Sequence, residues 1–334
     1  MKFSFALILW TLLGPSVYCV DAAAAEILLV SRYGDTASNG SIDVDIALTS
    51  NMKDDDEVKC TYRLSGSINL GDAEKLKSLI SSTKLLSGSP RLCLNSPGGS
   101  YREGLAIARI LMEEWIGTAV EANSFCASAC ALIFMAGTAP SRQQLNRFLH
   151  VNGMLGFHSP YLRGGAQGSF AEGVQAINEL VKLGRGRVPH FFDSDLVSEM
   201  LDKGPEELYL LDTIRKIIAN RVALYGSNIP TFSLESLINV CINYFYRDKL
   251  LLKTEEIQKL ARAASIKKYV NRINIEYDLA PRGGGCTVEL FGQNDYYTSW
   301  IFYPPTALAG ISLSYWYLYP PETKISDIPR LARH

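Results

Sequence analysis

Arg91-Leu-Cys-Leu-Asn-Ser-Pro-Gly-Gly99 joins a short, mostly apolar strand to a tight turn. The glycines let the backbone bend sharply and present bare N–H groups. Soon after it, Glu103 to Trp115 carries apolar side chains at the spacing of one helix face. A strand, a glycine turn and a helix in this order predict one unit of an α/β fold.

The same alternation recurs on both sides of this unit. The pattern predicts strands at Cys60–Leu64, Gly117–Val120 and Leu149–His158, and helices at Ala73–Ser82, Cys130–Ala136 and Phe170–Leu183. Strands that alternate with helices at this interval favour βαβ units and a mainly parallel sheet. In such a sheet, ligands collect at the carboxyl ends of the strands, where the turn Ser96–Gly99 lies.

Composition and pattern divide the chain into four parts. Residues 1–25 are a predicted signal peptide, 26–56 an N-terminal strand and linker, 57–226 the α/β domain, and 227–334 a C-terminal α+β region. The acidic run Asp54–Glu57 indicates a solvated boundary. In the C-terminal region we expect helices at Ser233–Leu251 and Thr254–Ile273, and we interpret the aromatic tail as packed core.

The N-terminus has the anatomy of an export signal. A positive charge at Lys2 precedes the apolar stretch Phe3–Val20, and the small residues Ala22–Ala25 follow it. The chain is therefore expected to be periplasmic or secreted. The alternative is an uncleaved N-terminal membrane anchor, which the interruption Gly14-Pro15 disfavours.

Composition and charge narrow the classes of function. The chain is 47% hydrophobic and 20% charged, which is typical of a globular protein with a proper core. A net charge of −1 argues against broad attraction to nucleic acid or anionic lipid. The sequence has no phosphate-binding glycine-rich motif with its lysine, so we expect no ATPase domain in this chain.

The chain has seven cysteines, of which Cys19 would leave with the signal peptide. An even number in an exported chain favours disulfides, because the compartment is oxidising. We favour the pair Cys126–Cys130 first, then Cys60–Cys93 and Cys241–Cys286. Scattered buried thiols are the alternative.

Three local features could supply the chemistry of a serine nucleophile, which needs a base, an acid to orient it and amides for the oxyanion. The first is the glycine turn at residues 96–99. The second is Ser128, set among small residues just before an apolar helix, where N–H groups favour negative charge. The third is His158, one of only four histidines, at the end of a strand.

Together, Asn95-Ser-Pro-Gly-Gly99, Ala127-Ser128-Ala129 and Gly156-Phe157-His158 resemble the Clp protease and crotonase superfamily, and most closely its exported Clp-protease-like branch. The resemblance covers residues 58–225. It implies an α/β fold with a crotonase-like (Clp protease-like) ββα spiral core, here with a small C-terminal α+β extension. Relatives assemble into rings or trimers, so it also implies a homo-oligomer.

The resemblance also implies roles for single residues. Ser128 would be the nucleophile and His158 its general base. The N–H groups of Gly99 and Ala129 would form the oxyanion hole. The substrate would be a peptide or protein, and no cofactor is implied.

The acid of the triad is less defined. Glu207 fits the position that the resemblance implies, Asp202 is the second candidate, and Asp193 and Asp195 lie further back. A glutamate where the proteases have aspartate is a departure, although either carboxylate can serve. This substitution leaves the third member open.

Cys126 and Cys130 flank Ser128, which is a further departure from cytosolic relatives. If both were on a helix, they would be one turn apart and within reach of a disulfide. Such a bond would stiffen the turn that presents Ser128. These two thiols with His158 lack the spacing of a zinc site, so no metal is expected.

Three other hypotheses remain open. A catalytically inactive Clp-like binding or scaffold module could keep the fold, because fold does not determine function. Crotonase chemistry on a coenzyme A thioester would leave the Ser128/His158 pair unexplained. A Ser–Lys dyad would use Lys182, the nearest lysine by position.

Overall fold

The chain has 334 residues. The computed structural model describes residues 25–32, 58–85, 88–139, 144–160, 170–184, 192–204, 206–227, 233–247, 265–269, 272–278, 285–293, 296–303 and 315–329. Residues 1–24 of the predicted signal peptide and the acidic run 54–57 lie outside the described residues. None of the described helices is long and apolar enough to cross a bilayer.

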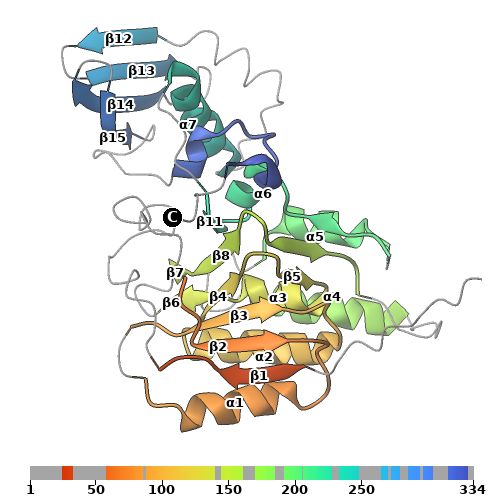
Figure 1. Ribbon diagram of the computed structural model, residues 1–334. Helices are drawn as coiled ribbons and strands as arrows, with labels where there is room; N and C mark the ends of the chain where they lie inside the picture. Colours follow the sequence, from red (N-terminus) through yellow and green to blue (C-terminus); the bar gives the residue numbers. More distant parts are fainter. Residues whose placement is uncertain are drawn as a thin grey trace, which may run out of the picture.

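A six-stranded sheet forms the centre of the α/β domain (Figure 1). Its strands follow the order β1 (Glu26–Leu29), β2 (Tyr62–Ser65), β3 (Arg91–Asn95), β4 (Gly117–Val120), β8 (Arg147–His150) and β11 (Ala223–Tyr225). All neighbours are parallel except β1, which runs antiparallel to β2. The mainly parallel sheet is therefore confirmed, and the molecule has a mixed α/β architecture.

A second, three-stranded sheet meets the carboxyl end of the first. Its order is β10 (Tyr209–Leu210), β9 (Met154–Phe157) and β5 (Phe125–Ala127), and a short pair is formed by β6 (Thr138–Ala139) and β7 (Gln144–Leu145). Ser96, one residue past β3, forms a parallel bridge with Cys126 in β5. This bridge carries the end of β3 into the second sheet.

The predicted strand region Leu149–His158 is wrong as a single element. It contains parts of two strands in different sheets, β8 and β9. A tight turn separates them, in which the N–H of Gly153 donates to the carbonyl oxygen of His150 at 2.7 Å. Asn152-Gly153 is a strong turn signal, which the apolar residues around it had masked.

Helices connect the parallel strands and cover the sheet. They are α1 (Asp72–Ser82), α2 (Tyr101–Glu113), α3 (Ala129–Met135), α4 (Phe170–Gly184), α5 (Ser194–Leu201) and α6 (Ile214–Ala219). All residues of α3 are buried, so this helix passes through the core. It contacts α2 and the strands β3 and β4 of the main sheet.

Helix α2 begins two residues before its predicted start because Ser100 caps it. The Ser100 hydroxyl accepts a hydrogen bond from the N–H of Glu103. The Glu103 carboxylate in turn accepts from the N–H of Ala73 at 3.0 Å, in the first turn of α1. These bonds join the starts of two helices beside the glycine turn.

The C-terminal region begins with α7 (Leu234–Arg247) and continues as a four-stranded antiparallel sheet. The strands are β12 (Ser265–Tyr269), β13 (Arg272–Asp278), β14 (Gly285–Gln293) and β15 (Tyr296–Tyr303). The predicted helix Thr254–Ile273 is wrong where the structure describes it, and residues 254–264 lie outside the described part. Arg272–Asp278 alternates polar and apolar residues with period two, the signature of a strand.

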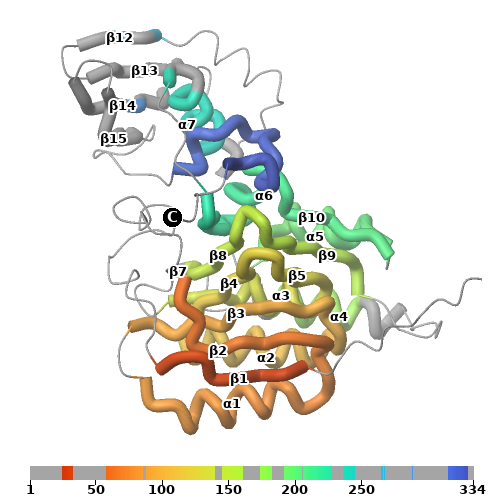
Figure 2. The backbone as a smooth tube through the Cα atoms, in the orientation of Figure 1, coloured from red at the N-terminus to blue at the C-terminus, as the bar shows by residue number. Residues whose placement is uncertain are grey.

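The chain ends in two short 3-10 helices, η4 (Tyr315–Leu318) and η5 (Ile325–Asp327), beside α6 and α7 (Figure 2). The Asn243 side chain donates to the carbonyl oxygens of Tyr317 and Tyr319, at 2.9 and 2.8 Å. Trp316 and Tyr317 are fully buried. At these positions the aromatic tail is packed core, as predicted.

Two predicted disulfides are present, with Cα–Cα distances of 5.6 Å for Cys60–Cys93 and 5.2 Å for Cys126–Cys130. Cys241 in α7 is also disulfide-bonded. Helix α7 contacts β14, the strand that includes Cys286. The pairing Cys241–Cys286 stays a prediction.

We expect the two described disulfides to differ in their effect on stability. Their cysteines are 33 and 4 residues apart, respectively. A disulfide lowers the conformational entropy of the unfolded chain, and the stabilisation is larger when the loop it closes is longer. We therefore expect Cys60→Ala/Cys93→Ala to lower the free energy of unfolding by about 4 kcal/mol and Cys126→Ala/Cys130→Ala to lower it by about 2 kcal/mol. Urea unfolding of both double variants measures this order. The reverse order would contradict the account.

Candidate functional site

Ser128 occupies the turn between β5 and α3. Its backbone has φ 58° and ψ −127°, a conformation that residues with a Cβ rarely adopt. Its N–H donates to the carbonyl oxygen of Gly156 at 3.1 Å, and its hydroxyl does not cap the helix. A strained residue that neighbouring hydrogen bonds hold in place is a feature of functional sites. A serine on a sharp strand-to-helix turn also presents its hydroxyl outward, as in a nucleophile elbow.

The Cys126–Cys130 disulfide spans this turn. Cys126 lies in β5 and Cys130 in α3, and both are fully buried. The two cysteines do not share a helix, because Cys126 belongs to the strand that pairs with β9. The bond joins β5 to α3 on either side of Ser128 and limits how far the strand and the helix can separate. We call this strand-to-helix turn at Ser128 the elbow.

The glycine turn packs directly against the elbow. An added Cβ at Gly98 would lie 2.6 Å from both the Ala127 carbonyl oxygen and the Ser128 Cβ. Gly98 itself has φ +95°. Both the space and the backbone conformation therefore require glycine at this position.

Hydrogen bonds fix the orientation of the glycine turn. The N–H of Ile68 donates to the Gly98 carbonyl, and the Ile68 carbonyl accepts from the N–H of Ser100, both at 2.8 Å. The buried Ser96 hydroxyl accepts from the N–H of Gly98 at 3.1 Å. These supporting roles were not predictable from the sequence: Ser96 stands in the glycine turn without a sign of its role, and Ile68 carries no sequence signal.

Neighbouring hydrogen bonds and the start of α3 orient the two amides predicted for an oxyanion hole. Because Ile68 bonds to the neighbours of Gly99 on either side, the N–H of Gly99 points away from Ile68. The N–H of Ala129 belongs to the first residue of α3, where a helix supplies no acceptor of its own. A Cβ at Gly98 would lie 3.0 Å from the Ala129 nitrogen, so the turn and the helix start adjoin. Neighbouring N–H donors of this kind can bind a developing oxyanion.

His158 follows β9 directly, and the pairing of β9 with β5 carries it toward Ser128. Ala127 lies opposite Gly156 in this parallel pair, so His158 comes one residue beyond the position opposite Ser128. Its Nδ1 is 2.7 Å from the carbonyl oxygen of Ser159. Since a carbonyl oxygen can only accept, Nδ1 carries the proton, and Nε2 of the neutral ring is left as the basic nitrogen.

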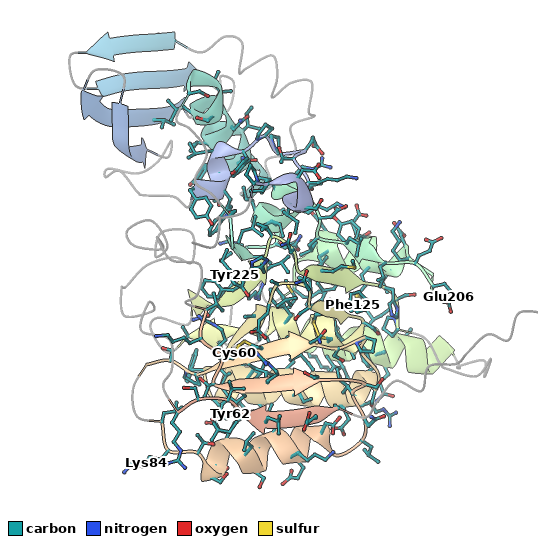
Figure 3. The ribbon with its side chains drawn as sticks, in the orientation of Figure 1. Cys60, Tyr62, Lys84, Phe125, Glu206 and Tyr225 are labelled. Atoms are coloured by element: carbon teal, nitrogen blue, oxygen red, sulfur yellow. A yellow bond between two sulfur atoms is a disulfide. The ribbon has the colours of Figure 1, made fainter. Side chains whose placement is uncertain are left out.

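Glu207, the first acid predicted for the triad, precedes the strand that pairs with β9. Glu207 is exposed, with its N–H donating to the Gly204 carbonyl at 3.1 Å just before β10. Continuing the β9–β10 register places Leu208 opposite His158 and Glu207 opposite Ser159. The preceding Glu206 lies at the periphery of the molecule (Figure 3). The role of Glu207 stays a prediction.

The remaining acids have other positions. Asp202 is exposed and ends α5 as its C-cap. Asp193 caps the start of α5 by accepting from the N–H of Asp195. The carbonyl of Ser159 is a partner of His158 that the sequence did not reveal, and the Ser159 hydroxyl donates to the Lys203 carbonyl at 2.8 Å.

Two other candidates are placed outside this arrangement. His150 accepts the N–H of Asn152 on Nδ1 at 3.0 Å, and its ring meets Tyr225 edge-on at 5.0 Å between centroids. Lys182 is exposed on α4. His150 thus has structural contacts.

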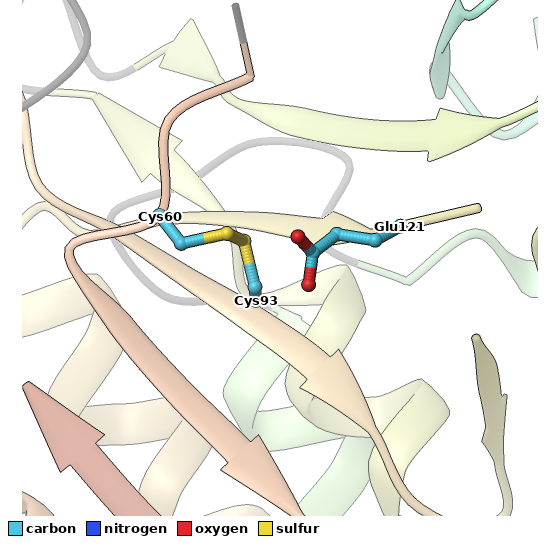
Figure 4. A group of neighbouring side chains, drawn as sticks. All are labelled: Cys60, Cys93 and Glu121. Atoms are coloured by element: carbon cyan, nitrogen blue, oxygen red, sulfur yellow. A yellow bond between two sulfur atoms is a disulfide. The ribbon is translucent and has the colours of Figure 1, made fainter. Parts of the chain in front are cut away.

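A second cluster of ligand-type atoms lies elsewhere on the sheet. Cys60, Cys93 and Glu121 bring a ligand atom each within 4.8 Å of one another (Figure 4). The two sulfurs are bonded to each other, and the Glu121 carboxylate accepts from Arg63 Nη2 at 2.8 Å. A disulfide offers no thiolate, so this group is a covalent link beside an ion pair and not a metal centre.

Comparison with known protein families and curated proteins found no match: no protein-family model matches the chain, and no curated protein matches it.

Proposed function

We propose that this chain is an extracytoplasmic serine hydrolase, specifically an ATP-independent peptidase with Ser128 as its nucleophile. One observation carries the proposal: the strained Ser128 elbow lies against the Gly98-Gly99 turn, next to the N–H groups that an acyl-transfer reaction needs. The resemblance to the Clp protease and crotonase superfamily, including a crotonase-like spiral core, supports the same conclusion.

In the proposed reaction, Nε2 of His158 takes the proton from the Ser128 hydroxyl as its oxygen attacks the substrate carbonyl carbon. The N–H groups of Gly99 and Ala129 hold the oxyanion that forms. His158 then gives the proton to the departing amine, and the acyl group stays on Ser128 as an ester. A water molecule, deprotonated by His158, attacks this ester and releases the acid.

The hydrogen bond from Nδ1 to the Ser159 carbonyl keeps the His158 ring in the basic tautomer required by this sequence. In the imidazolium state that follows proton transfer, a carboxylate would stabilise the charge more than a carbonyl does. We propose Glu207 for this role, with Asp202 as the second candidate.

The setting and substrate follow from the chain itself. Disulfides favour an oxidising compartment, and the N-terminal sequence supports export to the periplasm or beyond. A peptidase without an ATPase domain would act on short peptides or unfolded proteins. The superfamily resemblance supports assembly as a homo-oligomer.

A catalytically inactive binding module is the second candidate. The exposed position of Glu207 and the backbone partner of His158 Nδ1 favour it, because a triad normally orients its histidine through a carboxylate. Measured hydrolysis distinguishes this candidate from the first.

His158→Gln is expected to lower kcat/KM for a fluorogenic peptide by at least about a thousandfold, because Gln provides no basic nitrogen. Glu207→Gln and Asp202→Asn, assayed in parallel, identify the acid of the triad. Replacing the acid should lower kcat/KM by about ten- to ten-thousandfold, and replacing the other carboxylate should leave kcat/KM unchanged. Hydrolysis that survives His158→Gln would contradict the proposed mechanism.

A further inference from the structure

The Cys126–Cys130 disulfide closes a short loop with the proposed nucleophile at its centre. Its cysteines are 4 residues apart, against 33 for Cys60–Cys93, and Ser128 lies midway between them. A disulfide that closes so short a loop removes little entropy from the unfolded chain. Global stability is therefore a weak reason for this bond, and its position around Ser128 indicates a local role.

The backbone of Ser128 needs a local constraint. A residue with a Cβ is strained at φ 58° and ψ −127°, and such a conformation persists only where the surrounding structure holds it. The N–H of Ser128 bonds to Gly156 on the strand side, and its carbonyl accepts from the N–H of Ala131 on the helix side at 3.0 Å. The disulfide joins these two sides covalently, because Cys126 belongs to β5 and Cys130 to α3.

We propose that the Cys126–Cys130 disulfide positions Ser128 for catalysis, so that hydrolysis depends on its oxidation, whereas Cys60–Cys93 serves stability. This inference rests on the proposed function. Formation of the bond oxidises two thiols, and their two electrons and two protons pass to a disulfide oxidant, which is released as two thiols. Without the bond, the elbow relaxes and the N–H of Ala129 moves away from that of Gly99.

Burial makes the oxidised state persistent. Cys126 and Cys130 are both fully buried. Thiol–disulfide exchange requires a thiolate to reach one of the two sulfurs, which the folded chain prevents at these positions. The bond therefore forms during folding or local opening and then resists soluble thiols. A chain that folds in a reducing compartment is inactive, and one that folds in an oxidising compartment is active.

The same burial determines which kinetic constant should change. A fully buried disulfide cannot touch a bound peptide, so its loss acts through the position of Ser128 and of the Ala129 N–H. We expect Cys126→Ala/Cys130→Ala to lower kcat by about a hundredfold, because a displacement of catalytic groups by about 1 Å can cost that much. The value of KM should change by less than about twofold.

Cys60→Ala/Cys93→Ala is the matched control. It removes the same atoms from buried positions and lowers the stability more, but it should keep kcat within about twofold of the wild-type value. Circular dichroism establishes that each variant is folded. Cys130→Ala alone breaks the bond with a smaller loss of core volume, and it should reproduce the loss of kcat if the double variant does not fold.

Refolding tests the dependence on oxidation. Wild-type protein refolded with oxidised glutathione should hydrolyse peptide, and wild-type protein refolded in dithiothreitol should fold but hydrolyse at least about tenfold more slowly. Cys126→Ala/Cys130→Ala should be equally slow after both treatments. Wild-type protein that folds in dithiothreitol and retains full activity would overturn the inference.

A crystal structure of Cys126→Ala/Cys130→Ala, or of Cys130→Ala, separates this inference from the proposed function. Ser128 should leave the region of positive φ, whether or not the wild-type protein hydrolyses peptides. An inactive wild-type protein whose variant shows this change would contradict the proposed hydrolase and support the positioning role of the bond. A Ser128 that stays near φ 58° without the bond, or a variant with the kcat of the wild type, would overturn the inference.

Discussion

Ser128→Ala is expected to lower kcat/KM for peptide hydrolysis by about three to six orders of magnitude, the usual loss when a serine nucleophile is removed. The residual rate should come from substrate binding and the oxyanion donors alone. Steady-state assays with a fluorogenic peptide measure the loss. Ser82→Ala, at an exposed serine in α1, is the control and should leave kcat/KM unchanged.

The same position tests whether the elbow is strained. Glycine adopts positive φ without the penalty that a Cβ imposes, which is about 1–2 kcal/mol. Ser128→Gly should therefore abolish hydrolysis and yet raise the free energy of unfolding relative to Ser128→Ala, by about that amount. Equal stability of the two variants would show that the backbone at Ser128 is not strained.

Gly98→Ala is expected to lower kcat/KM by at least about a hundredfold, because displacement of catalytic groups by about 1 Å can cost that much. The added Cβ would lie 2.6 Å from the Ala127 carbonyl oxygen and the Ser128 Cβ. The glycine turn and the elbow would have to separate, which would move the Gly99 N–H away from Ala129. Kinetic assay of the folded variant measures the loss.

Gly71→Ala provides a matched control for this change. Gly71 has φ +93°, close to the +95° of Gly98, but an added Cβ there meets nothing within 4 Å. Both variants should lose about 1–2 kcal/mol of stability from the left-handed backbone, and only Gly98→Ala should also lose activity. Equal activity of the two variants would contradict the role given to the close packing of turn and elbow.

Local pattern predicted the main sheet because its signals are short-range. Apolar strands, glycine turns and helix faces recur at regular intervals, and the bounds predicted for β3 and β4 match the structure. The even number of cysteines and the oxidising compartment predicted disulfides and left the pairing open; the favoured pairs 60–93 and 126–130 are present. Each of these features depends on residues close in sequence or on a count.

The misplaced elements show where local pattern is ambiguous. In residues 149–158, apolar residues on both sides of Asn152-Gly153 resemble one continuous strand, although the turn there separates β8 from β9. In residues 265–273, lysines and isoleucines are compatible with a helix face as well as a strand. Pairing between β12 and β13 decides for the strand, and that contact is tertiary.

The candidate site was predictable only in part, for the same reason. Ser128, Gly99 and His158 were identifiable because each stands in a short motif. The support from Ile68, from Ser96 and from the Ser159 carbonyl depends on strand pairing and backbone direction. An acid near His158 depends on how a distant loop approaches it, which spacing along the chain does not determine.

The central claim is that Ser128 is an activated nucleophile, and the most direct test is to locate a covalent adduct. The folded, oxidised protein is treated with a fluorophosphonate, digested, and mapped by tandem mass spectrometry. The account predicts a single phosphonyl group on Ser128, absent after prior unfolding. An unmodified Ser128, or an adduct on another residue, would contradict it.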